Sequence, residues 1–189
     1  MQFSIVSYLD PQATAQVRGL QRTISEVTGS HASLSSWEPH VTIGDGVAVD
    51  DTERTRLVGE TQQLADETSA FELHMSGFSS LDNRPIGIGE VSTPYVLFVD
   101  VQVNPQLLDI VDRMQVITDK YTAWYHMPQP YLPHVTLAFR DLTREGFERG
   151  LDYLSDKDIR ITSVIDHIAL VEKLETKDVE YTRIPLETR

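Results

Sequence analysis

The sequence contains no cysteine among its 189 residues. Disulfide bonds and thiolate metal ligands are therefore excluded, and cysteine usage gives no indication of the redox compartment. No apolar run approaches the roughly 18 residues that a transmembrane helix needs. The N-terminal residues also lack the basic region of a signal peptide. We therefore expect a soluble cytoplasmic protein that has no membrane partner.

Positive charge is also scarce, because 16 Lys and Arg residues stand against 29 Asp and Glu residues, for a net charge of −13. A surface of this sign repels phosphate backbones, which argues against a protein that coats nucleic acid in general. A small phosphate ligand remains compatible if a cleft supplies its own positive groups. We therefore expect any nucleotide partner to be small.

The secondary structure predicted for the first half of the chain recurs in the second half. A strand over 3–8 precedes a helix over 11–28, for which Asp10-Pro11 is a start signal and Gly29 an end signal. A strand over 95–103 likewise precedes a helix that begins after Asn104 with Pro105. The other predicted elements are helices over 50–69 and 143–154 and strands over 71–78, 86–91, 161–171 and 181–186.

One short motif occurs twice. Pro-His-Val-Thr followed by an aliphatic residue stands at 39–43 and again at 133–137. A histidine followed two positions later by Ser or Thr is not rare here, since His31 and His74 also fit that pattern. The flanking proline, valine and aliphatic residue therefore distinguish His40 and His134 from the other histidines.

The motif occupies the same place in both series of elements, after the capped helix and a loop. This order indicates an internal duplication of roughly residues 1–90 and 91–189. A repeat of this length is too long for a solenoid unit and suits two similar α+β lobes. No low-complexity linker separates the halves, so we predict a single bilobal domain over 1–189.

The motif has a physical meaning on a strand, where side chains alternate between the two faces. Valine and the aliphatic residue would anchor each strand in a core, leaving imidazole and hydroxyl together on the open face. Two such strands facing each other would present His40, His134, Thr42 and Thr136 to one small ligand.

Cleavage of a phosphodiester without a metal needs this set of groups. One neutral histidine can take a proton from the attacking oxygen, and a second, protonated histidine can give one to the leaving oxygen. An ordinary histidine pKa near 6.5 allows both forms near neutral pH. The hydroxyls of Thr42 and Thr136 can donate hydrogen bonds to the non-bridging phosphate oxygens.

The paired motif resembles that of the 2H phosphoesterase superfamily, which includes 2′-5′ RNA ligase-like proteins and cyclic nucleotide phosphodiesterases. The resemblance covers nearly the whole chain, with the strand candidates 71–78, 95–103 and 181–186 in the expected order. It implies an α+β fold of two pseudo-twofold-related lobes. Each lobe would be an antiparallel sheet with helices on its outer side, and the active-site cleft would lie between them.

The same resemblance implies hydrolysis of 2′,3′-cyclic or related phosphates without a metal or other cofactor. It carries catalytic roles onto His40 and His134 and phosphate contacts onto Thr42 and Thr136. A metal held by the two histidines is the alternative, but no carboxylate or third histidine stands at ligand spacing beside either motif.

Three further residues are candidates for substrate contact. On a straight strand Arg140 would share the face of His134, and it would then either contact a phosphate or base or extend into solvent. The aromatic residues Trp37 and Tyr131 precede the two motifs. They would either stack on a nucleobase at the cleft mouth or pack the lobes together.

We therefore expect a monomeric, metal-independent cyclic phosphodiesterase acting on a 2′,3′-cyclic nucleotide or an RNA-end cyclic phosphate. Two alternatives use the same cleft. One is a nucleotide-binding module with little turnover, and the other is a 2′-5′ RNA ligase that runs the reaction in reverse. The sequence does not assign the acid and the base between the two histidines.

Overall fold

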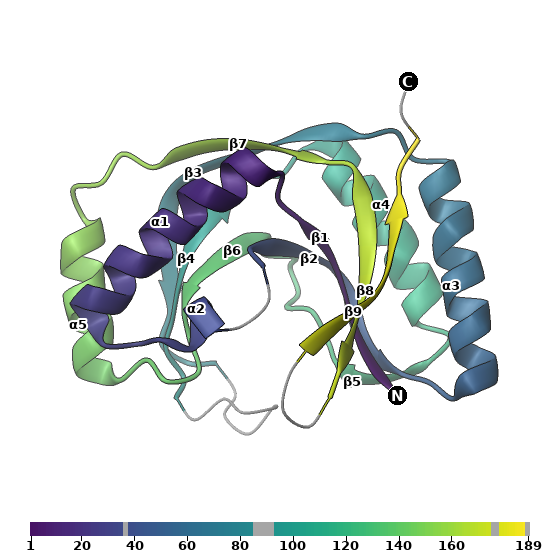
Figure 1. Cartoon of the computed structure of the whole chain (residues 1–189), viewed down its shortest axis with the longest axis horizontal. Helices are drawn as coiled ribbons and strands as arrows, with labels where there is room; N and C mark the ends of the chain where they lie inside the picture. The colour runs from purple at the N-terminus through teal and green to yellow at the C-terminus, as the bar shows by residue number, and fades with distance from the viewer. Residues whose placement is uncertain (36–37, 85–92, 175–177, 188–189) are drawn as a thin grey trace.

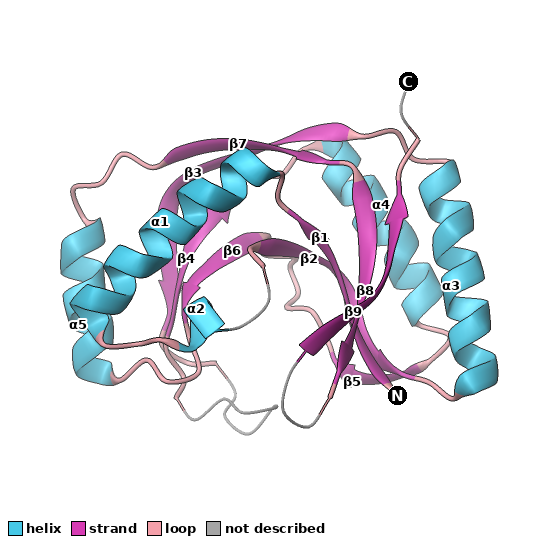
Figure 2. Ribbon diagram, in the orientation of Figure 1, coloured by secondary structure: helices cyan, strands magenta, loops and turns pink. Residues whose placement is uncertain are grey.

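The computed structural model describes residues 1–35, 38–84, 93–174 and 178–187. Trp37 and the strand predicted over 86–91 therefore lie outside the described residues. Two antiparallel sheets curve around the middle of the molecule, and helices cover their outer sides (Figure 1, Figure 2). The predicted α+β architecture of two lobes is thus confirmed.

Five strands form the first sheet, in the order β5-β2-β1-β8-β9. They are β1 (Gln2–Tyr8), β2 (His40–Ala48), β5 (Thr122–Tyr125), β8 (His167–Lys173) and β9 (Asp178–Pro185). Four strands form the second sheet, in the order β6-β4-β3-β7. They are β3 (Phe71–Leu81), β4 (Val96–Val101), β6 (His134–Ala138) and β7 (Arg160–Ile165).

The helices begin where the sequence places their caps. In α1 (Pro11–Thr28) the Asp10 carboxylate accepts hydrogen bonds from two backbone N–H groups of the first turn, and Gly29 ends the helix with a φ of 78°. Asn104 caps α4 (Pro105–Thr118) in the same way. The other helices are α2 (Ala32–Ser35), α3 (Asp51–Asp66) and α5 (Arg144–Leu154).

The two halves of the chain interleave, so that neither half forms a lobe alone. Strand β3 comes from the first half but pairs with β4 and β7 of the second, while β8 returns to pair with β1. The helices are exchanged as well: α1 packs with α5 against the four-stranded sheet, and α4 packs with α3 against the five-stranded sheet (Figure 1).

One predicted strand is two strands in the structure. The run 161–171 breaks at Asp166, where the chain leaves the four-stranded sheet as β7 and enters the five-stranded sheet as β8. At this joint the buried His167 accepts a hydrogen bond from the Tyr8 N–H at its Nε2 and donates from Nδ1 to the Asp166 carboxylate. The prediction of one strand was wrong because an apolar pattern does not record which sheet a residue joins.

Among the residues that the structure describes, no helix is long and apolar enough to cross a membrane. The main core is continuous across both lobes. A second, smaller cluster, formed by Val6, Tyr8, Ala169 and Val171, covers part of the five-stranded sheet.

Candidate active site

The two motif strands, β2 and β6, contact each other where the two sheets meet. Burial alternates along both strands as the sequence predicts. The Val and aliphatic side chains of each motif are 0–1% exposed, whereas the His and Thr side chains are half-buried. His40, Thr42, His134 and Thr136 all line one cavity of about 600 Å³. The tertiary structure therefore brings together the four residues that the repeated motif singles out.

Both motif histidines are held by the same local hydrogen bond. The Nδ1 atom of His40 lies 2.8 Å from the Glu38 carbonyl oxygen, and that of His134 lies 2.8 Å from the Leu132 carbonyl oxygen. A carbonyl oxygen only accepts, so Nδ1 carries a hydrogen in both rings. The proton that each imidazole gains or loses is therefore the one on Nε2.

Each imidazole also packs against an aromatic ring from the neighbouring strand. Tyr8 of β1 meets His40 nearly edge-on, with ring centroids 6.3 Å apart, and Phe98 of β4 lies 4.8 Å from His134. Such contacts, together with the Nδ1 hydrogen bonds, restrict the rotation of both rings. The two motif histidines thus have similar surroundings in the neighbouring strands β1 and β4.

The two histidines differ in their electrostatic surroundings. Burial lowers the pKa of His40 to about 4, and the positive charges of His134, Arg18 and Arg140 act in the same direction. Burial also lowers the pKa of His134, with Arg84 acting in the same direction, but the Asp100 carboxylate partly opposes the shift. Both shifts favour the neutral imidazole, and the Asp100 carboxylate favours the protonated form of His134.

The motif threonines are fixed through their backbone carbonyls, each by a residue from the opposite half of the chain. The Tyr131 hydroxyl donates to the Thr42 carbonyl at 2.7 Å, and the Gln21 amide donates to the Thr136 carbonyl at 2.9 Å. Tyr131 also packs against the core. These contacts favour the packing alternative for Tyr131 over stacking on a nucleobase.

Arg140 lines the cavity, although β6 ends before it, at Ala138. The chain turns there with a φ of 66° at Arg140, a left-handed conformation that is uncommon for a residue other than glycine. Its guanidinium lies 3.6 Å from the Asp178 carboxylate of β9 and 4.7 Å from the centroid of the Phe139 ring. The alternative of a solvent-exposed arginine is thus disfavoured.

The cavity is locally less acidic than the rest of the molecule. Among the described residues, its lining includes three cationic side chains (Arg84, Arg140 and Lys173) and two acidic ones (Glu38 and Asp178), in a protein of net charge −13. Arg84 lies 5.7 Å from the centroid of the Phe139 ring, on which Arg140 also packs. An anion is therefore more readily accommodated here than elsewhere on the surface.

Several lining residues were not identified from the sequence. Arg84 follows β3, and Trp124, Tyr125 and His126 lie on β5 and directly after it, but none of them belongs to a repeated motif. The one available signal was the pair of adjacent aromatic residues at 124–125, in a stretch for which no strand is predicted.

Among the described residues, no group of three or more His, Asp or Glu side chains gathers in a way that could hold a metal ion. The expectation of a metal-independent reaction stays a prediction.

Comparison with known proteins agrees with the fold. The family model of the 2′-5′ RNA ligase superfamily matches residues 49–177, a span that begins after the first motif and contains the second. The chain belongs to this superfamily. The resemblance to 2H phosphoesterases is thereby confirmed. A protein of Geobacillus sp. (strain WCH70) named "putative phosphoesterase" is 24% identical over 139 residues, which are 72% of this chain and 71% of the relative.

Solved structures of other proteins share the whole fold. The TT0787 protein of Thermus thermophilus aligns over 100% of both chains with a TM-score of 0.68 and 16% identity. Escherichia coli LigT in complex with 3′-AMP aligns over 98% of this chain and 97% of its own, with a TM-score of 0.66 and 13% identity. At these identities the likeness establishes the fold alone.

Proposed function

We propose that this superfamily member hydrolyses a cyclic phosphodiester, such as a 2′,3′-cyclic nucleotide or an RNA-end cyclic phosphate, by two-histidine acid–base catalysis without a metal. The observation that carries this proposal is the matched pair of imidazoles. His40 and His134 are both held at Nδ1 by a carbonyl and line one cavity together with Thr42 and Thr136. A duplicated structural histidine would have no need of a shared cavity.

The different surroundings of the two histidines suggest which is the base. His40 has its pKa lowered to about 4, so it is neutral at physiological pH and suited to take a proton from the attacking water. As the water oxygen bonds to phosphorus, the bond from phosphorus to one ribose oxygen breaks. His134, in its protonated form, gives its Nε2 proton to that leaving oxygen. The product is a nucleoside monophosphate.

The negative charge of the bound phosphate would be stabilised by polar and positively charged side chains that line the cavity. The hydroxyls of Thr42 and Thr136 would donate to the non-bridging oxygens, and Arg84 and Arg140 would supply the positive charge that the cavity adds to an acidic protein. A small nucleotide is the partner we favour, in keeping with LigT, whose solved complexes hold 3′-AMP and NADP⁺.

The test is a panel of 2′,3′-cyclic nucleotides and oligonucleotides ending in a cyclic phosphate, assayed with EDTA present. We expect turnover on at least one member at a rate that the chelator leaves unchanged. Turnover abolished by EDTA would contradict the metal-free mechanism. Measurable nucleotide binding without any turnover would instead support the binding module. Joining of RNA ends, in place of hydrolysis, would support the ligase.

A further inference from the structure

The cavity extends beyond the motif residues to the end of the five-stranded sheet. Trp124 of β5 lies across that sheet there, because Gly46 of β2 has no side chain to obstruct it: a Cβ at Gly46 would come within 2.6 Å of the indole. The indole N–H donates to the Phe3 carbonyl at 3.1 Å, which fixes the ring as a rigid wall. The Lys173 ammonium lies 5.1 Å from the centroid of the same ring. A cation is thus held at this end of the cavity.

His126, two residues after Trp124, also lines the cavity and is oriented by a buried carboxylate. Its Nδ1 lies 2.8 Å from Oδ2 of Asp45, whose side chain is 6% exposed, whereas the His126 side chain is 78% exposed. Asp45 is held in turn by the Met127 N–H at 2.7 Å and the Gln115 amide at 3.2 Å. A carboxylate only accepts, so Nδ1 carries a hydrogen, and Nε2 is the atom that can meet a ligand.

Asp45 is a buried carboxylate that has an exposed ring among its hydrogen-bond partners. A buried carboxylate must be compensated by several hydrogen bonds, and here one of those bonds goes to an imidazole that is largely exposed in the cavity. A buried partner would have satisfied Asp45 equally well. The exposed face of His126 is therefore suited to a ligand, with Asp45 as the residue that positions it.

The spacing along β2 shows that these groups lie beyond the reacting phosphate. Thr42 belongs to the motif, whereas Asp45 and Gly46, which contact His126 and Trp124, come three and four residues later. At about 3.3 Å per residue, this places the far end on the order of 10 Å from Thr42. A group that reaches it must belong to a part of the substrate other than the cyclic phosphate.

We propose that His126 and Lys173 form a second phosphate subsite, positioned by Asp45, which selects nucleotides carrying a further phosphate at the 5′ position. This inference rests on the proposed function, because the first phosphate is taken to lie between His40 and His134. Lys173 contributes a fixed cation, and His126 in its protonated form donates from Nε2 to a phosphate oxygen. The substrate class is then a 5′-phosphorylated cyclic nucleotide or the end of an oligonucleotide.

The experiment compares the binding of adenosine 3′,5′-bisphosphate and adenosine 3′-phosphate by isothermal titration calorimetry. We expect the wild-type protein to bind the bisphosphate about tenfold more tightly, as one additional charged contact predicts. In His126→Ala and in Lys173→Met we expect this ratio to fall below about threefold. The two variants are independent, so a folding defect in one leaves the other as a test.

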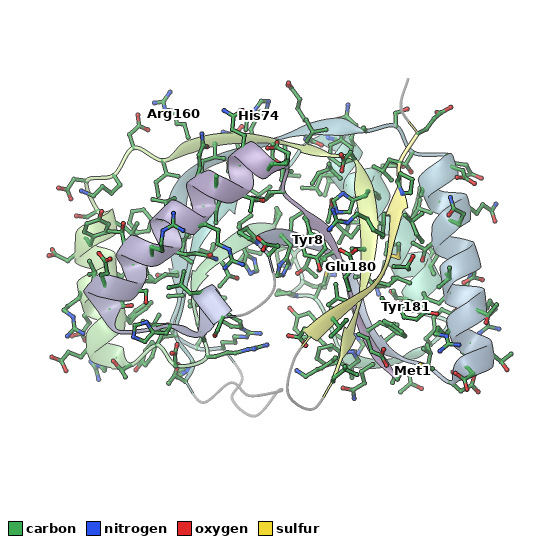
Figure 3. All side chains as sticks on the ribbon, viewed as in Figure 1. Met1, Tyr8, His74, Arg160, Glu180 and Tyr181 are labelled. Atoms are coloured by element: carbon green, nitrogen blue, oxygen red, sulfur yellow. The ribbon has the colours of Figure 1, made fainter. Side chains whose placement is uncertain are left out.

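Matched controls lie away from the cavity. His74 is a half-exposed histidine on β3, at the outer edge of the molecule in Figure 3, and is also close to a carboxylate, that of Glu72. Lys157 packs over the ring of Tyr153 much as Lys173 packs over Trp124. His74→Ala and Lys157→Met should keep the tenfold ratio.

Equal affinities for the two ligands in the wild-type protein would overturn the subsite, as would a tenfold ratio that survives in His126→Ala and Lys173→Met. Binding needs no turnover, so the two proposals can fail separately. If the protein prefers the bisphosphate but cleaves no cyclic nucleotide, the proposed hydrolysis is contradicted and the proposed subsite is supported. Cleavage without the preference would remove the subsite alone.

Discussion

His40 and His134 each make the same type of hydrogen bond to a nearby backbone carbonyl, and an ordinary strand histidine does not need this bond. A ring that only filled space could satisfy Nδ1 in many ways, but both rings use the carbonyl two residues earlier, at the same distance of 2.8 Å. This bond specifies the tautomer and directs the ring, as a positioned general acid or base requires. The prolines at positions 39 and 133 lie between each carbonyl and its histidine, and their fixed φ helps to hold that geometry.

Replacing either histidine should remove one of the two proton transfers. We expect His40→Ala and His134→Ala each to lower the rate on a cyclic nucleotide by about 10²–10⁴-fold, the usual contribution of a general acid or base. Binding of adenosine 3′-phosphate should survive in both. His74→Ala serves as the control. A near-normal rate in either motif variant would contradict the two-histidine assignment.

The dependence of kcat/KM on pH follows from the two pKa values in the unliganded protein. His40 must be neutral to act as the base, so activity rises as the pH passes its pKa of about 4. His134 must be protonated to act as the acid, so activity falls as the pH passes its pKa, which burial lowers from 6.5. We therefore expect a bell-shaped profile with one limb near pH 4 and the other below the ordinary histidine pKa of 6.5. The acidic limb should disappear in His40→Ala, and a maximum above pH 7.5 would contradict these roles.

At the scale of elements, the ends of the helices depend on residues close by in the sequence. The caps of α1 and α4 lie where the sequence predicts them, because Asp10 and Asn104 bond to backbone N–H groups two or three residues later. The short α2 lies in a stretch that was expected to be a loop, and the strand β5 was not predicted. They are held by contacts with distant segments, including the Asp141 carboxylate, which accepts from the N–H groups of His31 and Ala32.

The packing of α5 provides a test of close approach between elements. A Cβ added at Gly150 would collide with Leu97 of β4 and lie 3.0 Å from Thr28 of α1. We expect Gly150→Ala to lower the free energy of unfolding by about 1–3 kcal/mol through overpacking, as measured by urea denaturation.

The matched control is Gly59 in the middle of α3, where an added Cβ meets no described atom within 4 Å. Here the helix propensity of alanine should dominate, and Gly59→Ala should raise stability by about 0.5–1 kcal/mol. Equal effects of the two substitutions would show that α5 does not pack as closely as the structure indicates.

At the scale of the whole molecule, the interleaved halves depend on each other. Without the second half, β3 loses both of its partners, β4 and β7, and β1 loses β8. Without the first half, β8 retains β9 but loses β1, and α4 loses β2, the strand against which it packs. We therefore expect the chain to fold as one unit, although it is bilobal in shape.

We expect fragments 1–90 and 91–189 to be unfolded or aggregated when each is produced alone, because each exposes unpaired strand edges and apolar faces. The intact chain should unfold in one cooperative transition. Circular dichroism and the dispersion of amide resonances would measure both. A well-dispersed spectrum from either fragment alone would contradict the interdependence of the halves and would favour two separable lobes.

The sequence by itself determined the local features: the capped helices, the alternation of buried and cleft-facing residues in the motif strands, and the pairing of two like motifs. These follow from backbone geometry and side-chain periodicity within a few residues. The tertiary structure decided which sheet each element joins, how Tyr131 and Gln21 hold the motif threonines, and which residues besides the motif reach the cavity. Those outcomes depend on contacts between segments far apart in the chain, and a local sequence pattern does not predict such contacts.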